Sequence, residues 1–208
     1  MMLTLRWLLL VALVGIGQLV SAQDTLVAGG SSWRDSLDSY WARMDAEYAD
    51  STTSPLRPED RAHFNHLARF ARDSSYCVQA RFTPVKDAEP FTMRTSTARL
   101  PMFKTHGTLL FTLKGVEYMV SVYEDAVPDP RYPGYLFLPF TDLTNGDQTY
   151  GAGRYLDLKA PLADTVILDF NKAYNPYCAY NDKYSCPIPP SENHLPTTVK
   201  AGVLKFHD

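Results

Sequence analysis

The chain is poor in cysteine, in positive charge and in long hydrophobic runs. Three of its 208 residues are cysteines, and 20 lysines and arginines stand against 23 aspartates and glutamates, for a formal net charge of −3. A mildly acidic chain lacks the concentrated positive surface that nucleic acids and anionic lipids require. We therefore expect no nucleic-acid partner. The few cysteines also exclude a scaffold built on many disulfides, and the length is sufficient to bury a full core without them.

One long hydrophobic run is present, WLLLVALVGIGQLV at residues 7–20, and no second run follows it. It comes after Arg6 and is followed by small residues that suit cleavage after Ala22. The run is short for a membrane-spanning helix. We therefore predict a cleaved signal peptide over residues 1–22 and an exported protein, periplasmic or secreted, without an integral membrane segment. No cysteine stands directly after the run, which excludes a lipoprotein anchor there.

Removal of the signal peptide leaves 186 residues (208 − 22), a length that fits one domain. The formal net charge becomes −4, because the removed segment carries one arginine and no acid. The stretch AGGSS ends a flexible lead-in over residues 23–32, and we predict a single domain over residues 33–208. The sequence contains no internal repeat and no low-complexity tract.

Two helices are predicted at the start of the domain. Apolar residues recur at helical spacing over Trp33–Tyr48, and Ser32 and Asp35 resemble a capping box in front of them. The second helix is predicted over Pro58–Ala71, since a proline and two acids suit a first helical turn and apolar residues then continue on one face.

From Tyr76 onward, strand signals repeat at short intervals, which favours a folded or closed antiparallel sheet over alternating strands and helices. Lys114-Gly115 predicts a tight hairpin, because glycine supplies the positive φ that such a turn needs. We predict a mainly β fold, an antiparallel β-barrel or sandwich of about eight strands with two short N-terminal helices. The predicted strands are Tyr76–Val85, Phe91–Phe103, Thr108–Leu113, Glu117–Tyr123, Tyr135–Pro139, Arg154–Lys159, Val166–Asn171 and Thr197–Phe206.

Cys178 and Cys186 are separated by seven residues in the stretch AYNPYCAYNDKYSCPIPPSENH. An exported protein meets an oxidising environment, so we predict a disulfide between them, with free thiols or a metal as the alternatives. The closed loop would stabilise the fold by about 2–3 kcal/mol on the chain-entropy estimate. The spacing is not that of structural zinc sites, and we expect no metal and no other cofactor. Cys77 is expected to be a small buried apolar residue.

One arginine is predicted to lie among leucines, where an exposed surface residue is not expected. In GRYLDLK, alternation puts Arg154 and two leucines on one face of a strand and Tyr155 and Asp157 on the other. A hairpin with the following strand would bring Asp169 diagonal to Arg154 on that face. A buried guanidinium requires such a partner. The arginine therefore belongs either to a satisfied polar network that fixes strand register or to the wall of a binding pocket.

The prolines that follow Cys186 cannot extend a central strand, so the segment that contains them is expected to cross over the sheet. It would bring Glu192 and Asn193 with it. We therefore predict that the hairpin Arg154–Asn171 and the segment Asn175–His194 build one polar site, with Glu192 near the arginine.

Several stretches together resemble a known family. LFLPFTDLTNGDQTYGAGRYLDL, DFNKAYNPYCAYNDKYSCPIPPSENHLPTTVKAGV, SPLRPEDR and TSTAR are similar to sequences of domain-of-unknown-function family 1684 of bacteria and archaea. The resemblance runs from about Trp33 almost to the C-terminus. That family has no established activity, so the resemblance implies motif positions and no chemistry. These positions are Arg99, Tyr150, Arg154, Asp157, Asp169, Asn171, Asn175, Pro176, Glu192 and Asn193.

Two departures from the family's pattern stand near these positions. Family-like sequences usually have three glycines where this chain has Gly-Ala-Gly before Arg154, which is a minor change. Many also have arginine at the position of His194. A position that is often cationic makes His194 a poor candidate for a catalytic base or a zinc ligand.

Three classes of function follow from the sequence. Polar and aromatic motif residues cluster late in an all-β chain, which favours a cell-envelope domain that binds an unknown small-molecule ligand. A hydrolase-like enzyme that divides acid and base roles between Asp169 and Glu192 is one alternative. A structural or interaction module, in which the motif residues only build the fold, is the other. The predicted ligand-binding residues are Arg99, Tyr150, Arg154, Asp157, Asp169, Asn171, Asn175, Glu192 and Asn193.

Overall fold

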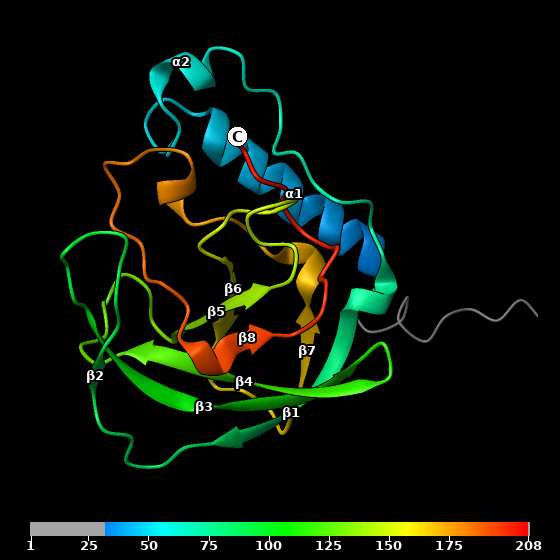
Figure 1. Cartoon of the computed structure of the whole chain (residues 1–208), viewed down its shortest axis with the longest axis vertical. Helices are drawn as coiled ribbons and strands as arrows, with labels where there is room; N and C mark the ends of the chain where they lie inside the picture. The colour runs from blue at the N-terminus through cyan, green and yellow to red at the C-terminus, as the bar shows by residue number, and fades with distance from the viewer. Residues whose placement is uncertain (1–31, 208) are drawn as a thin grey trace, which may run out of the picture.

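The computed structural model describes residues 32–207 (Figure 1). The predicted signal peptide, and the predicted lead-in except for Ser32, lie outside the described residues. Within them, no helix is long and apolar enough to cross a membrane. Helix α1 spans Trp33–Ala49 and α2 spans Pro58–Arg61. The strands are β1 Cys77–Pro84, β2 Phe91–Thr92, β3 Met102–Leu113, β4 Val116–Asp125, β5 Tyr135–Asp142, β6 Arg154–Lys159, β7 Thr165–Asp169 and β8 His194–Leu195.

The strands form one curled sheet. They hydrogen-bond in the order β6-β5-β4-β3-β1-β7, with β2 added to β3 and β8 added to β5. All pairs are antiparallel except β5 with β8. The predicted mainly β architecture of about eight strands is confirmed. Strands β6 and β7 lie at opposite ends of this order, yet only residues 160–164 join them. Because so short a connection spans at most about 20 Å, the sheet must curl until its outer strands approach.

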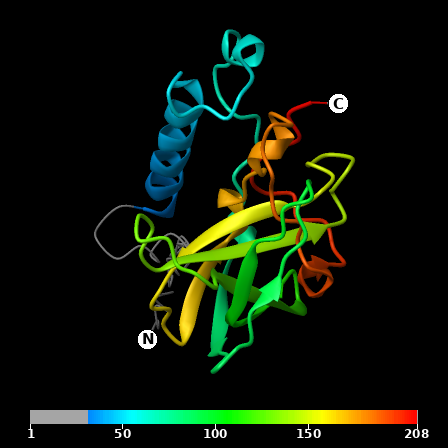
Figure 2. The ribbon, with the colours of Figure 1, turned by 90° about the vertical axis from the view of Figure 1, so that its left-hand side faces the viewer.

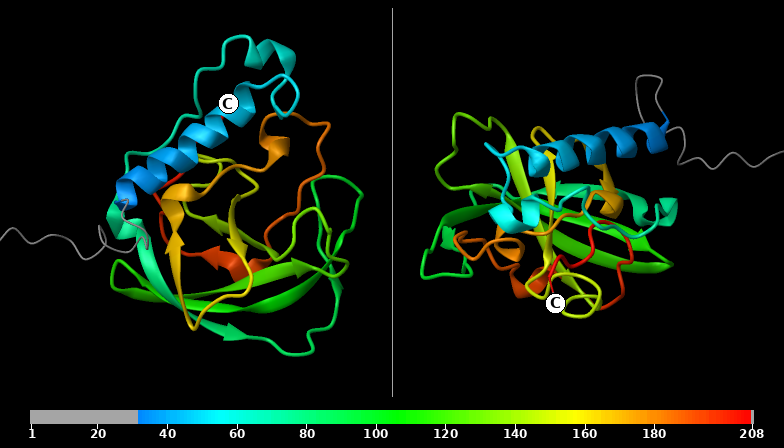
Figure 3. Two further views of the ribbon diagram at one scale, coloured as in Figure 1. Left: turned by 180° about the vertical axis from the view of Figure 1, so that it is seen from behind. Right: turned by 90° about the horizontal axis from the view of Figure 1, so that it is seen from above.

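The curled sheet is a half-barrel that helix α1 crosses. Figure 3 shows the long strands curving around β8, with α1 lying across the open side. In Figure 2 the sheet fills the lower part of the molecule and α1 stands above one side of it. We call the gap between the outer edges of β6 and β7 the seam. A cavity of about 560 Å³ lies along the seam, and residues of both strands and of α1 line it.

Strands β5 and β6 have two apolar faces, which belong to different parts of the molecule. Leu138 and Leu156 are paired across the two strands and face the main core inside the half-barrel. Phe137 and Tyr155 face the opposite way and pack with Phe103 in a smaller cluster. Both faces of β5 are therefore covered. Its residues are buried in a continuous run instead of alternating between buried and exposed.

Helix α1 begins at the predicted capping box. Ser32 Oγ accepts a hydrogen bond from Asp35 N, and the Asp35 carboxylate accepts one from Ser32 N, each at 3.2 Å. The indole nitrogen of Trp41 donates to Asn171 O at 3.1 Å, which fastens the helix to the chain after β7. The predicted helix is therefore present and packs against the β region. Its buried residues are Trp33, Leu37, Trp41 and Tyr48.

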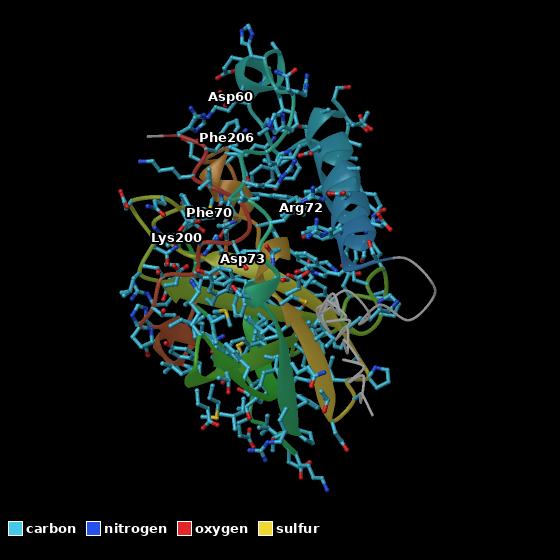
Figure 4. All side chains as sticks on the ribbon, turned by 90° about the vertical axis from the view of Figure 1, so that its right-hand side faces the viewer. Asp60, Phe70, Arg72, Asp73, Lys200 and Phe206 are labelled. Carbon is cyan, nitrogen blue, oxygen red and sulfur yellow. The ribbon has the colours of Figure 1, made fainter. Side chains whose placement is uncertain are left out.

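The second predicted helix, over Pro58–Ala71, is wrong in length: α2 has four residues, and the rest of that range has no regular structure after one turn. Tertiary contacts outweigh the local pattern here. Phe70 N donates to Gly202 O at 3.0 Å, and Leu67 N donates to Asp45 of α1 at 2.9 Å. This stretch therefore lies between α1 and the C-terminal segment (Figure 4).

Two predicted strands also differ from the structure. Phe91–Phe103 is not one strand, because residues 93–101 form a loop between β2 and β3. Thr197–Phe206 is not a strand either. Gly202 has a φ of +79°, and a Cβ at this position would collide with Ala173 O. This C-terminal segment packs against the core instead, whereas the predicted Lys114-Gly115 hairpin is present, with positive φ at both residues.

Candidate functional site

A cavity of about 770 Å³ opens over the outer face of β5 and β6. Helix α1 contributes Met44 and Glu47 to its wall, and the chain around residues 174–187 contributes another side. We call this space the tyrosine cavity, because tyrosine is the commonest residue in its lining. Its aromatic residues are Phe103, Tyr132, Tyr135, Phe137, Tyr155, Tyr174, Tyr177 and Tyr184.

Two tyrosine hydroxyls converge on the Asp157 carboxylate in the wall of the tyrosine cavity. Tyr135 donates to Asp157 Oδ1 at 2.9 Å, and Tyr174 donates to the same oxygen at 2.6 Å. Phe137 is the register partner of Asp157, so Tyr135 lies diagonally across on the same face of the sheet. The backbone of Tyr174 exchanges two hydrogen bonds with that of Tyr155, at 2.9 and 3.1 Å, which places its ring beside Asp157.

The Asp157 side chain is exposed, and it lines both the tyrosine cavity and the cavity along the seam. Partial desolvation by the protein raises the pKa of its carboxyl above the ordinary value, hydrogen bonds from Tyr174 and Tyr135 lower it, and the negative charge of Glu47 raises it. Burial also raises the pKa of the Tyr135 and Tyr174 hydroxyls, so both stay protonated and donate at neutral pH. The two hydroxyls therefore orient the Asp157 carboxyl group, and no residue of 32–207 forms an ion pair with it.

Several aromatic rings of the cavity pack at steep angles, whereas Phe103 and Phe137 are stacked, with ring planes 30° apart. Tyr155 contacts Phe137 edge to face, with ring centroids 4.6 Å apart at 79°, and Tyr174 in the same way, at 5.9 Å and 89°. Tyr177 and Tyr184 meet at 5.3 Å and 58°. Rings arranged in this way hold one another in fixed positions in the cavity wall.

Arg99 belongs to a loop that holds another wall in place. Its guanidinium Nη2 donates to Ser185 O at 2.7 Å, and Nε donates to Ser185 Oγ at 3.2 Å. In the same loop, Ser96 N donates to Cys186 O at 2.9 Å, and Cys186 N donates to Ser96 Oγ at 3.1 Å. These bonds fix the segment that carries Tyr184 along the cavity.

Cys178 and Cys186 lie next to each other beside this wall, and Cys186 lines the cavity. Both are thiols in the structure, and Cys178 N donates to Cys186 Sγ at 3.1 Å. The hydrogen bond from the Cys186 thiol lowers the pKa of Cys178 to about 6, and the same contact raises the pKa of Cys186. Tyr150 reaches this pair, with its hydroxyl 3.7 Å from Cys178 Sγ. The predicted disulfide stays a prediction.

Arg154 lies on the other face of β6, and its predicted contact with Asp169 is wrong. Strand β6 pairs with β5 and β7 pairs with β1, so the predicted hairpin does not form. Arg154 Nη2 instead donates to Asp142 Oδ2 and to Val199 O, each at 2.8 Å, and Nη1 donates to Ala201 O. These contacts form a buried polar network that joins the sheet to the C-terminal segment, in which Arg154 Nε alone of the guanidinium nitrogens has no hydrogen-bond partner among residues 32–207.

Asp169, Asn171 and Asn175 are also held by the fold. Asp169 Oδ2 accepts from the indole nitrogen of Trp33 at 2.9 Å, and Oδ1 accepts from Asn171 N and Nδ2 at 3.0 and 2.8 Å. The Asn171 amide bonds both backbone groups of Asp73, at 3.0 and 2.9 Å. Asn175 Nδ2 donates to a backbone oxygen of the C-terminal segment at 2.9 Å. Together they attach α1 and the C-terminal segment to the sheet.

The Asn193 side chain links two strands that share few backbone hydrogen bonds. Strands β4 and β5 have one register pair, and the buried Asn193 amide connects them at Ser121 and Pro139. It accepts from Ser121 N at 2.7 Å and donates to Ser121 O at 2.8 Å and to Pro139 O at 2.7 Å. The neighbouring Glu192 carboxylate accepts from the Tyr123 hydroxyl at 2.9 Å.

The structure therefore divides the predicted site. Arg99 and Asp157 line the tyrosine cavity, together with the motif residue Pro176. Within residues 32–207, no ion pair or hydrogen bond joins Arg154 to Glu192 or Asp169. Ligand binding by the predicted residues outside the cavity stays a prediction. No three side chains of the described histidines, cysteines, aspartates and glutamates gather as metal ligands would.

Sequence analysis did not single out the tyrosines around Asp157. Tyr135 stood at the start of a predicted strand, and Tyr174 lay in a loop. The available signal was the alternation on β6, which put Tyr155 and Asp157 together on the face opposite the arginine. That face carries the cavity.

Comparison with known proteins gives a family and a structure. The sequence model described as "Protein of unknown function (DUF1684)" matches residues 62–204. A solution NMR structure of the uncharacterized protein from gene locus rrnAC0354 of Haloarcula marismortui is similar, with 36% sequence identity and a TM-score of 0.67. The match covers 83% of this chain and 94% of the archaeal chain. No curated protein matches this chain.

Proposed function

This chain belongs to the DUF1684 family of proteins of unknown function, and from that premise we propose that it binds a small organic molecule in the tyrosine cavity. The observation that carries the proposal is the convergence of Tyr135 and Tyr174 on Asp157. Two hydroxyls orient one carboxylate oxygen, and the side chain remains open to the cavity.

The dimensions and chemistry of the cavity support the proposal. Its volume of about 770 Å³ lies in the range of small-molecule sites, which are mostly apolar with a few fixed polar groups. Aromatic side chains supply the apolar walls here, while Asp157 and Arg99 supply polar groups. Location in the cell envelope is part of the proposal and rests on the predicted signal peptide.

The two alternatives have less support. A hydrolase that uses Asp169 and Glu192 would need both carboxylates in one site, whereas Asp169 bonds Trp33 and Glu192 bonds Tyr123 in separate networks. A structural module would account for Arg154 and the buried asparagines. It gives no reason for an open carboxylate at the end of two tyrosine hydroxyls.

Native mass spectrometry of the protein purified from its own host tests the proposal. We expect a retained small molecule in the wild type and in Asp147→Asn, an exposed aspartate outside the cavity lining. The molecule should be lost from Asp157→Asn. Apoprotein in all three samples, together with no binding in a small-molecule screen by ligand-observed NMR, would contradict the proposal.

Stability separates a binding role of Asp157 from a structural one. Burial raises the pKa of this carboxyl in the folded state, so its ionised form opposes folding at neutral pH. Asparagine removes the charge and can still accept both hydroxyls. The ligand-free Asp157→Asn protein should therefore unfold at a urea concentration no lower than the wild type. A clear loss of stability would assign the residue to the fold.

A further inference from the structure

We infer that the ligand of the tyrosine cavity is an organic cation, an amine attached to an apolar or aromatic body. This inference rests on the proposed function, because it concerns the same cavity. It follows from the charge of the lining, the open oxygen of Asp157 and the faces of the aromatic rings.

The lining is strongly acidic. It contains five carboxylates and one basic side chain, Arg99. Two of the carboxylates already have partners, since Glu124 pairs with His106 and Asp129 pairs with Arg131. The other three form no ion pair with any residue of 32–207. They are Glu47, Asp125 and Asp157.

Arg99 does not neutralise these groups. Its guanidinium donates to the backbone and hydroxyl of Ser185. It lowers the pKa of Asp125 only in part, because burial and the charge of Asp129 leave that pKa raised. Glu47 accepts one neutral hydrogen bond, from Tyr177 at 2.9 Å. Negative charge therefore remains in the cavity after every partner among the described residues has been counted.

Asp157 has an oxygen available for a ligand. Both tyrosine hydroxyls donate to Oδ1, and within residues 32–207 no donor hydrogen-bonds Oδ2. Burial and the charge of Glu47 both disfavour the ionised carboxyl. An ammonium group at Oδ2 would reverse this penalty, since an opposite charge at hydrogen-bond distance favours the ionised form. A neutral donor would do so less, and an anion would increase the penalty.

The rings suit the same class of ligand. Tyrosine and phenylalanine faces carry partial negative charge and attract cations within about 6 Å of the ring centre. Tyr135 and Tyr174, whose hydroxyls donate to Asp157, line the cavity and place two such rings beside its carboxylate. Binding of a cation by aromatic faces and a carboxylate together is stronger than either contact supplies alone.

Three probes of similar size and different charge test the inference: 2-phenylethylamine, 2-phenylethanol and phenylacetate. Titration of the protein after unfolding and refolding has removed any retained ligand, followed by ligand-observed NMR, gives the three affinities. We expect the amine to bind at least about tenfold more tightly than the alcohol, and the acid to bind weakest. The amine should lose this advantage in Asp157→Asn. It should keep it in Asp147→Asn, which removes an equal charge outside the cavity.

The outcomes separate the inference from the proposed function. Binding of the alcohol or the acid as tight as that of the amine overturns the cation inference and leaves ligand binding intact. An amine preference that persists in Asp157→Asn also overturns it, because the preference then arises from general charge. Absence of binding by all three probes overturns the cation inference, while the native mass spectrometry and the small-molecule screen described above decide ligand binding itself.

Discussion

Arg154 and Asp142 form an ion pair 2.8 Å long in which neither side chain exposes any surface to solvent. The guanidinium also donates to two backbone oxygens of the C-terminal segment, and Asp142 Oδ1 accepts from Val199 N at 3.1 Å. The pair therefore joins β5, β6 and the C-terminal segment at one point.

Removing the Arg154 side chain should destabilise the fold strongly. Arg154→Ala leaves Asp142 buried and without its counter-ion, so the free energy of unfolding should fall by about 3–5 kcal/mol. Urea unfolding followed by circular dichroism measures the change. Arg131→Ala breaks an exposed ion pair and should leave the urea midpoint unchanged. Similar midpoints for the two variants would show that the buried pair does not hold the segment.

The bridge made by Asn193 gives a second prediction. Asn193→Asp keeps the shape of the side chain but places an oxygen opposite Ser121 O and Pro139 O, and it buries a charge. We expect the free energy of unfolding to fall by at least about 2 kcal/mol, because two buried acceptors lose their donor. Asn65→Asp, the same change at an exposed position, is the control and should have little effect. Equal urea midpoints would refute a bridging role.

The thiol pair gives a third prediction, for reduced protein. The pKa of Cys178 is lowered to about 6, so this residue is mostly thiolate at pH 7, and its alkylation should slow as the pH falls through 6. Burial raises the pKa of Cys77 to about 12, so that thiol should react far more slowly. Mass spectrometry after brief treatment with iodoacetamide gives the order. Cys186→Ala removes the donor and should slow labelling of Cys178.

Export gives a fourth prediction. Protein recovered from its own host should begin at Gln23. Thiol counting on unfolded, unreduced material should find one thiol, Cys77, because we predict a crosslink between the other two cysteines in an oxidising compartment. Terminal sequencing by mass spectrometry measures the first property. An intact residue 1 would contradict the signal peptide, and three thiols would contradict the disulfide.

Strand β6 marks the limit of sequence-based prediction for this site. Alternation correctly put Arg154 and Leu156 on one face and Tyr155 and Asp157 on the other. It could not identify the neighbouring strand, because chain order favoured β7 whereas the curled sheet puts β6 beside β5. The rule that a buried guanidinium needs an acid was right. Its partner is Asp142 rather than Asp169, since partners depend on register and register was not known.

Local pattern predicted the fold better than the site. The capping box at Ser32 and the hairpin at Lys114-Gly115 depend on a few adjacent residues, and both are present. The predicted length of the second helix was wrong because the backbone of Phe70 and Leu67 hydrogen-bonds to residues far away in sequence, and no local pattern reveals such contacts. Tyr174 reaches Asp157 through a backbone bridge to Tyr155, which is likewise invisible in sequence.

The seam between β6 and β7 has a consequence for self-association. Apart from the bridge at Tyr174, no strand of the described chain pairs with the outer edge of either strand. Such an edge is a template on which a strand of another molecule can be added. Trp33 and Tyr40 of α1 line the cavity along these edges and so stand where an incoming strand would dock. Detachment of α1 would therefore expose the edges of β6 and β7 to pairing with strands of other molecules. In its docked position the helix protects the protein against this aggregation.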